Sequence, residues 1–451
     1  MRTTRTTQTS LFDPDPVDHP VADDMERVSG WLDALPELAD EVAADLGAGP
    51  GNAAGRHGLS CEAVLRCALL RHMRQETYRG LEFVLRDSLS AQRFARVDTA
   101  RLPGKSALQE TISAIGAATW ERINRRLLAA ARDAGIETGE RVRVDSTVTA
   151  AHILEPADSR LLYDGVRVLT RLLVRARDAF GADVVAFHDH RRAAKRRALE
   201  VPRRRGKERK AATYRRLLRI VARTRGYAAA ALPEVGAAAG ADPKWAAWRD
   251  EVVRYDVLLG QVVDQTRRRV LGGETVPASE KIVSLFEPHA DIVVKGGRGT
   301  HYGHKVNLAT GRSGLALDVV VEDGNPADSS RCLPMLERHA AHYGAAPTHA
   351  AFDGGYATHR NLADAKTLGV KHAVFHRKRA MKPEDMTPSS WVHAQLRRFR
   401  AGIEAGISYL KRCFGLGLCR WRGLARFKAY VHSAVVAHNL TRMARLGPSP
   451  G

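Results

Sequence analysis

Apolar residues recur at helical spacing through the first third of the chain. Between residues 59 and 134 they return every three or four positions, first after Ser60, a good helix N-cap, then from Tyr78 and again after Ser106. Such spacing places apolar side chains on one face of a helix. The pattern predicts an all-α N-terminal region, with an arm, a helix and a linker at 1–57 and short helices at 58–138. Short helices with brief turns fit a helix-turn-helix-like module, and a plain helical bundle fits them equally well.

The periodicity changes to strict alternation at 141–149, which predicts a β-strand. Residues 156–274 return to helical spacing and form a long insertion. Beyond it, two short apolar runs joined by Gly-Arg-Ser-Gly predict a hairpin. The strands expected in this part are 302–310, 315–322, 348–352 and 371–375. The helices expected there are 328–342, 358–368, 391–415 and 425–445.

The order of these elements is one strand, the helical insertion, two strands, and then helices alternating with two more strands before a final helix. This order matches the ribonuclease H-like topology, in which the first strand is central, the fourth lies beside it and the last helix packs across the sheet. We therefore predict an α/β ribonuclease H-like catalytic core, a mixed five-stranded sheet with flanking helices, at 139–155 and 275–446. The basic helical insertion at 156–274 interrupts this core.

Three acidic residues stand where this topology would bring them together. Asp145 lies on the first strand, Asp353 follows the strand at 348–352, and Glu404 lies within the helix at 391–415. Ligands gather at the carboxyl ends of strands in open α/β sheets. Three carboxylates form an all-oxygen site for hard divalent cations. Paired metals at such a site can catalyse in-line phosphodiester chemistry.

Two basic residues flank the glutamate on its helix. At 100° per residue, Arg400, Glu404 and Lys411 fall within about 60° of one another. Arg400 and Lys411 could therefore clamp phosphates on either side of the site. The alternative is an ordinary surface pair of Arg400 with Glu404, which stabilises a helix by only about 0.2–0.5 kcal/mol. Gly402 and Gly406 share another face of this helix and would be explained by the close approach of another backbone.

The charge of the chain points to a polyanionic partner. Lys and Arg number 71 against 50 Asp and Glu, a formal net charge of +21. Nucleic acid is the obvious polyanion, with a merely soluble basic protein or an anionic membrane surface as alternatives. Between residues 191 and 225, sixteen Lys or Arg residues stand against two Glu, more than a solvated face needs. The candidate DNA contacts in this run are Arg203, Arg204 and Arg205.

Other features of the sequence bound the location of the protein. It has no run of 18 apolar residues, so we expect no transmembrane helix. Its N-terminus lacks the apolar core of a signal peptide. Its five cysteines form no Cys-x-x-Cys pair, which suits a reducing compartment and offers no structural zinc site. We expect a cytoplasmic, nucleoid-associated protein without a membrane partner.

At these motifs the sequence resembles bacterial insertion-sequence transposases with a DDE-type catalytic domain. The similar segments are Val-Asp-Ser-Thr-Val at 144–148, Tyr-Gly-His-Lys-Val at 302–306, Val-Val-Glu-Asp-Gly-Asn-Pro-Ala-Asp at 320–328, Phe-Asp-Gly-Gly-Tyr-Ala at 352–357, Phe-Arg-Ala-Gly-Ile-Glu-Ala-Gly-Ile-Ser-Tyr-Leu-Lys-Arg at 399–412, and the run at 413–423. One subclass of the family places Tyr, Arg, the catalytic Glu and Lys at fixed spacings on the last helix. Arg400, Glu404 and Lys411 match that spacing, and Arg397 stands at the Tyr position.

The resemblance implies that Asp145, Asp353 and Glu404 are catalytic and ligate two Mg²⁺ (or Mn²⁺) ions. One ion would activate water or a 3′-hydroxyl, and the other would stabilise the leaving oxygen. It also implies that the helical region 58–138 binds DNA at the element's terminal repeats, and that target DNA is the second partner. We expect a homodimer on DNA. The candidate DNA contacts outside the insertion are Arg400, Lys411, His304 and Lys305.

The sequence thus predicts a DNA transposase that cleaves at the ends of an insertion element and joins them to target DNA. A metal-dependent nuclease of the same fold, or a catalytically silent DNA-binding protein derived from a transposase, are the alternatives. The triplet His188, Asp189 and His190 could be a metal cluster, but it precedes the basic run and we do not expect it to be a ligand set. The terminal-repeat sequence, the target preference and the excision route stay open.

Overall fold

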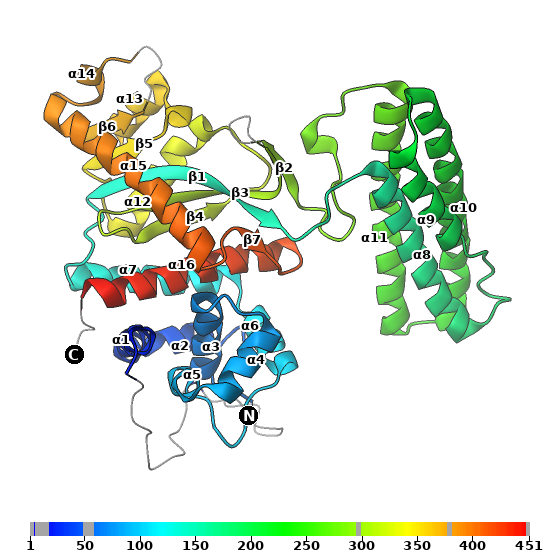
Figure 1. Ribbon diagram of the computed structural model, residues 1–451, viewed down its shortest axis with the longest axis horizontal. Helices are drawn as coiled ribbons and strands as arrows, with labels where there is room; N and C mark the ends of the chain where they lie inside the picture. The colour runs from blue at the N-terminus through cyan, green and yellow to red at the C-terminus, as the bar shows by residue number, and fades with distance from the viewer. Residues whose placement is uncertain (1–3, 5–17, 48–57, 295–298, 377–380, 448–451) are drawn as a thin grey trace. The chain divides into compact units, whose positions relative to one another are not determined.

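The chain folds into two compact units, Met1–Ala150 with His304–Gly451, and Ala151–Gly303. The computed structural model describes residue 4 and residues 18–47, 58–294, 299–376 and 381–447 (Figure 1). The predicted N-terminal arm and the linker predicted to end at residue 57 fall largely on residues outside this range. The helix expected before the linker is present as α1 (Pro20–Ala34) and α2 (Glu37–Glu41).

Five further helices precede the first strand, and side-chain oxygens cap several of them. They are α3 (Cys61–Met73), α4 (Tyr78–Asp87), α5 (Leu89–Ala95), α6 (Lys105–Ala114) and α7 (Ala117–Asp133). Ser60 accepts a hydrogen bond from the N–H of Ala63, and Thr77 accepts one from Gly80. Such caps satisfy backbone donors that have no partner within the helix. Helix α3 is buried on all sides along nearly its whole length, so it is the centre of this region and not an amphipathic surface helix.

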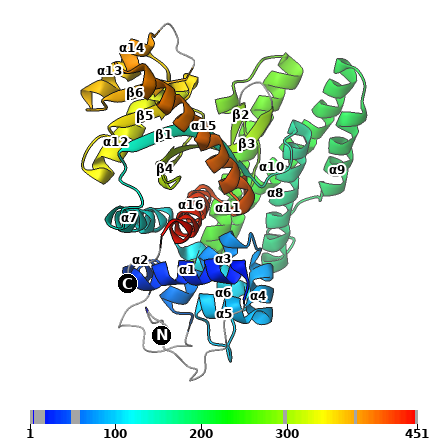
Figure 2. The ribbon, with the colours of Figure 1, turned by 60° about the vertical axis from the view of Figure 1, so that its left-hand side comes forward.

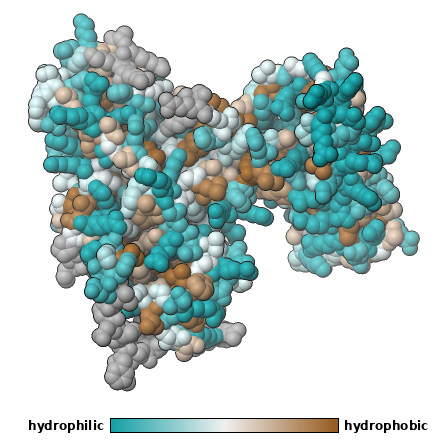
Figure 3. All heavy atoms as spheres, in the orientation of Figure 1, coloured by the Kyte–Doolittle hydropathy of each residue, from teal (hydrophilic) through white to brown (hydrophobic). Residues whose placement is uncertain are grey.

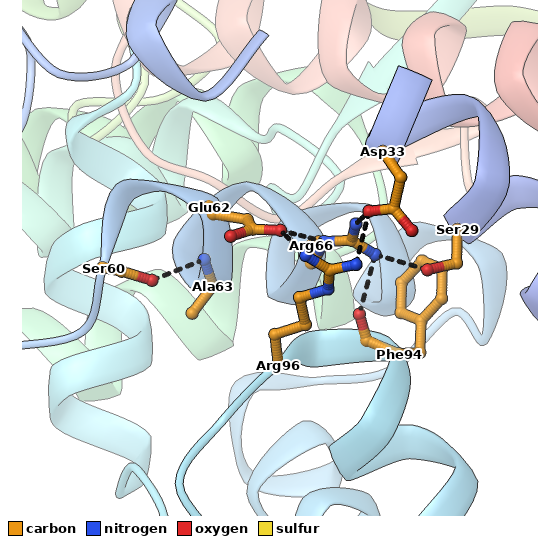
Figure 4. Close-up of polar contacts among 8 residues, drawn as sticks. All are labelled: Ser29, Asp33, Ser60, Glu62, Ala63, Arg66, Phe94 and Arg96. Carbon is orange, nitrogen blue, oxygen red and sulfur yellow. Dashed lines mark hydrogen bonds and ion pairs between the residues drawn. The ribbon is translucent and has the colours of Figure 1, made fainter. Parts of the chain in front are cut away.

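A buried arginine joins helices α1, α3 and α5. The side chain of Arg66 on α3 is 1% exposed, and each of its three guanidinium nitrogens has a partner (Figure 4). Burial lowers the pKa of Arg66, and Arg96 adds to this effect, while the two carboxylates oppose it. A buried charge that is fully paired ties its partners to one geometry, because losing one partner leaves an uncompensated charge. The partners are Ser29 and Asp33 of α1, Glu62 of α3 and the carbonyl of Phe94 on α5.

His72 joins α3 to the last helix of the chain, α16 (Leu424–Leu446). One ring nitrogen, Nε2, lies 2.8 Å from Ser433 Oγ, and the other, Nδ1, lies 3.2 Å from the carbonyl of Phe414. Burial, followed by the charge of Arg71, lowers the pKa of His72 to about 3. Burial likewise lowers the pKa of His339 and of His438 to about 4. All three histidines belong to the unit formed by Met1–Ala150 and His304–Gly451.

These histidines are expected to make that unit sensitive to acid. Below pH 6.5 they bind protons in the unfolded chain but not in the folded unit, so the free energy of unfolding falls between about pH 6.5 and pH 4. The loss is up to about 1.4 kcal/mol per pH unit for each histidine. Urea titrations at several pH values measure this slope. In His72→Gln, whose amide does not titrate, we expect a shallower slope, and equal slopes in the two proteins would contradict the prediction.

The sheet is mixed and has seven strands in the described residues. They are β1 (Arg141–Ala151), β2 (Asp291–Val294), β3 (Thr300–Thr310), β4 (Ala316–Val321), β5 (His349–Phe352), β6 (His372–Phe375) and β7 (Leu418–Cys419). The order is β2-β3-β1-β5-β6, with β4 paired to β3 and β7 paired to β1. β1, β5 and β6 are parallel, and β3 pairs antiparallel with β2 and with β4. The predicted mixed sheet with flanking helices is confirmed, while the predicted count of five strands omitted β2 and β7.

Helices cover both faces of the sheet. Helix α15 (Ser390–Cys413) crosses one face over β5 and β6, and α12 (Cys332–Tyr343) and α13 (His359–Thr367) lie on the other (Figures 1 and 2). Two 3₁₀ turns, Asp328–Arg331 and Gly354–Tyr356, precede α12 and follow β5. The short helix α14 (Pro383–Met386) leads into α15. Helix α16 packs against α7, α3, α1 and β4, and so joins the sheet to the N-terminal helices.

The second unit is a helical bundle. It contains α8 (Asp158–Phe180), α9 (Arg191–Glu200), α10 (Lys207–Ala239) and α11 (Pro243–Thr266), then a π-helical turn at Arg267–Gly272 and a 3₁₀ turn at Ala278–Glu280. Its core contains Trp248, whose Nε1 donates to the carbonyl of Leu172. Gly165 allows α8 to approach α11, because a Cβ there would lie 2.4 Å from Leu259. Hydrophilic residues cover most of this unit's surface in the view of Figure 3.

Candidate active site

The parallel register of β1 and β5 sets two aspartates side by side. Val144 is paired with Phe352 at the end of the ladder, so Asp145 and Asp353 are the next residues on the two strands. Both strands point the same way, and both aspartates therefore stand at the same edge of the sheet. The backbone N–H of Ser146 donates to Asp145 Oδ1 at 2.7 Å, which fixes the orientation of that carboxylate.

Helix α15 brings a glutamate and an arginine to the two aspartates. Arg400 Nη2 lies 3.3 Å from Asp145 Oδ2 and 3.2 Å from Asp353 Oδ1, and its Nη1 lies 3.1 Å from Glu404 Oε1. The exposed fraction of the carboxylate side chains rises from 11% at Asp145 to 40% at Asp353 and 68% at Glu404. The three acidic residues singled out in the sequence thus surround one guanidinium. The site is buried at Asp145 on β1 and open to solvent at Glu404 on α15.

A second arginine holds α15 against β1. Arg143 Nη1 donates to the carbonyl of Phe399 at 2.7 Å, and its Nε donates to Thr310 Oγ1 at 2.8 Å. Its guanidinium also lies 4.6 Å from the ring centroid of Phe399. A Cβ at Gly402 would come within 2.3 Å of Arg143 Nη1, so this glycine permits the approach. The neighbour of Gly402 is therefore a side chain and not the expected backbone, and nothing described lies within 4 Å of a Cβ at Gly406.

A chain of buried polar side chains begins three residues after Asp353. Tyr356, which follows Asp353 by three residues, is fully buried and donates its hydroxyl to Asn307 Oδ1 at 2.9 Å. Burial raises the pKa of Tyr356, with smaller contributions from Asp328 and Asp145, so its hydroxyl keeps its proton. Asn307 in turn donates to Glu322 Oε1 at 2.6 Å. Sequence patterns marked 320–328 and 352–357 as motifs, but did not show that they meet in this chain of hydrogen bonds.

Two predicted DNA contacts lie inside the domain. His304 is 1% exposed, and its Nδ1 lies 3.0 Å from the carbonyl of Glu322. Lys305 is 7% exposed, and its Nζ lies 2.6 Å from Asp328 Oδ1 and 2.7 Å from the carbonyl of Pro326. These contacts fasten the segment at 322–328 to β3. Direct contact of either residue with DNA stays a prediction, and it would require the side chain to be uncovered.

The other predicted DNA contacts differ in their surroundings. Lys411 follows Glu404 by seven residues and therefore returns to the same side of α15. Arg397, at the position of the family's Tyr, is exposed one turn before Arg400. In the helical unit the three candidates are exposed, and one of them is ion-paired with Glu200. These three are Arg203, Arg204 and Arg205.

The donor chemistry of the site fits a hard divalent cation, because all three acidic groups offer carboxylate oxygens. Within the described ranges, however, no group of three or more Asp, Glu, His or Cys side chains is arranged to hold an ion. At this site a single nitrogen of Arg400 contacts both aspartates, so the guanidinium stands between the carboxylates. In the other candidate cluster, Asp189 is bonded to the guanidinium of Arg191.

The fold and these residues define an α/β protein with a carboxylate site at the point where the parallel pairing of β1 and β5 ends. Residues 264–440 match the family model of the transposase DDE domain, and no curated protein and no solved structure matches the chain. Residues 264–440 are therefore identified as a transposase DDE domain, the kind of domain that the motifs of the sequence predicted. The match includes Asp353, Arg400 and Glu404, and it begins after Asp145.

The match to the DDE domain bears on the partner and on the metal of the site. A transposase acts on DNA, and the DDE family normally uses divalent metal ions. None of the described helices is long and apolar enough to span a bilayer.

Proposed function

We propose that this transposase cleaves DNA at the ends of its own insertion element and joins those ends to target DNA by two-metal-ion chemistry. The observation that carries the proposal is the meeting of Asp145, Asp353 and Glu404 around one guanidinium. We further propose that the catalytic domain is ribonuclease H-like. The parallel order β1-β5-β6, with β3 on the other side of β1 and β4 antiparallel to β3, supports this assignment.

In this proposal Asp145, Asp353 and Glu404 hold two Mg²⁺ or Mn²⁺ ions. Such ions activate the attacking hydroxyl and stabilise the charge that develops on the leaving oxygen. The chain supplies the geometry. Asp145 within β1 and Asp353 directly after β5 stand side by side, and the N–H of Ser146 orients Asp145. Helix α15 presents Glu404 from the solvent side, where a DNA strand can approach.

DNA would be held by basic residues outside the carboxylates. Lys411 is suited to neutralise a phosphate near the scissile bond, because it lies two helical turns beyond Glu404 on the same side of α15. The exposed arginines of the helical unit would hold the flanking duplex, and the helices at 58–138 would bind the terminal repeats. A homodimer on DNA in the cytoplasm would bring two element ends together.

A plasmid that carries the flanking DNA of the element tests this proposal. With Mg²⁺ or Mn²⁺ we expect cuts at the element boundary and products in which element ends are joined to new DNA, and with EDTA we expect neither. The balance of products decides between the candidate activities. Cuts without joined products would identify a nuclease, and tight binding without cuts in any metal would identify a silent DNA-binding protein.

A further inference from the structure

Arg400 contacts all three carboxylates of the candidate site. Its Nη2 is shared between Asp145 and Asp353, and its Nη1 bonds to Glu404. Its side chain is only 12% exposed, although Arg397, one turn earlier on α15, is exposed. A positive charge in this position offsets the repulsion among three carboxylates that would otherwise be crowded at one edge of the sheet.

The contacts of Arg400 with the carboxylates are long, as expected for a cation that another cation can replace. They measure 3.1–3.3 Å, longer than the 2.7–2.9 Å usual for charge-assisted hydrogen bonds. Its Nε is buried and has no hydrogen-bond partner among the described residues. Arg66 in the same chain is different, because all three of its nitrogens are bonded. Two of the contacts, to Glu404 and to Asp145, are long hydrogen bonds, so Arg400 is held less tightly at the carboxylates than Arg66 is held by its partners.

We propose that Arg400 is an internal counter-cation that leaves the carboxylates when DNA binds, so that DNA binding and metal loading are coupled. The inference rests on the proposed function of the three carboxylates. A divalent ion would need the same oxygens at about 2.0–2.1 Å for Mg²⁺ and would be repelled by a guanidinium in contact with them. A DNA phosphate offers that guanidinium two parallel hydrogen bonds and a full charge in exchange. Arg400 thus passes from protein carboxylate to DNA phosphate, and the vacated oxygens become available to metal.

Mn²⁺ binding to the full-length protein, measured from the paramagnetic resonance signal of free Mn²⁺, tests the coupling without any turnover. Without DNA we expect Arg400→Gln to bind Mn²⁺ about tenfold more tightly than the wild type, within the usual range of coupling between sites. Arg398→Gln removes the same charge from an exposed position of α15 and is expected to bind as the wild type does. With a saturating 30-base-pair duplex, the difference between Arg400→Gln and the wild type should shrink to within about twofold, because DNA then removes the guanidinium from the wild-type site.

Two outcomes would overturn the coupling. One is equal Mn²⁺ affinity of the wild type and Arg400→Gln without DNA, and the other is a difference that DNA leaves unchanged. Asp353→Asn separates this failure from failure of the proposed function. If Asp353→Asn loses Mn²⁺ binding while Arg400→Gln equals the wild type, the metal site stands and the counter-cation role is wrong. If Asp353→Asn binds Mn²⁺ as the wild type does, the proposed metal site itself is wrong.

Discussion

Asp145→Asn is expected to abolish DNA cleavage while leaving DNA binding nearly unchanged. Asparagine has the same shape and keeps an oxygen for the N–H of Ser146, so β1 should not move at this position. It removes the charge of the most buried carboxylate at the site, whose side chain is 11% exposed. We expect a loss on the order of a thousandfold, the size of effect seen when one preorganised electrostatic contact is removed from an active site. Single-turnover cleavage of an end-containing duplex measures it.

The same loss is expected for Asp353→Asn and for Glu404→Gln, because all three carboxylates act on one site. Asp364→Asn is a matched control. It removes a carboxylate from α13, on the other face of the sheet, where Asp364 forms a 3.5 Å ion pair with the exposed Arg360. This variant should cleave at the wild-type rate. Wild-type cleavage by Asp145→Asn would mean that the cut is made elsewhere in the protein.

Neutralising the basic surface of the helical unit is expected to weaken DNA binding strongly and to flatten its salt dependence. Four exposed arginines of this surface have no ion pair within the described part of the chain, so their charges are available to phosphates. If all four contact phosphates, the slope of log affinity against log salt should become shallower by about 3.6, at roughly 0.9 per contact. At 0.1 M salt the affinity should fall on the order of a hundredfold to a thousandfold. The four residues, each changed to Gln, are Arg203, Arg205, Arg216 and Arg223.

Fluorescence anisotropy of a labelled duplex across a range of salt concentrations measures both quantities. Changing the same four arginines to lysine keeps the charge and gives the matched control. Counterion release depends on neutralised phosphates, so the lysine protein should retain most of the salt slope. A Gln protein that binds with wild-type affinity and slope would place DNA away from the helical unit.

Local patterns gave most of the secondary structure of the catalytic domain. The hairpin predicted at 302–310 and 315–322 is present as β3 and β4, and the strand predicted at 348–352 is present as β5. The last two helices were predicted at 391–415 and 425–445 and are α15 and α16. These elements were predictable because alternation, helical spacing and glycine turns are properties of neighbouring residues.

The surroundings of single side chains were less predictable. The spacing of Arg400 and Glu404 predicted either a phosphate clamp or a surface ion pair, and the pair does exist at 3.1 Å. What the spacing did not contain is the simultaneous contact with two aspartates, one of them 255 residues away. For the same reason, the motif that contains His304 and Lys305 gave no sign that both side chains are buried.

The sequence by itself determined the residue types of the site, the order of strands and helices, and the basic charge of the helical unit. These follow from composition and from the short-range periods of helix and strand. The tertiary structure decided which groups meet. The register of β1 against β5 sets Asp145 beside Asp353, and the packing of α15, permitted by Gly402 against Arg143, brings Arg400 between them. Register and helix packing depend on contacts between residues far apart in the chain, and only the folded protein specifies those contacts.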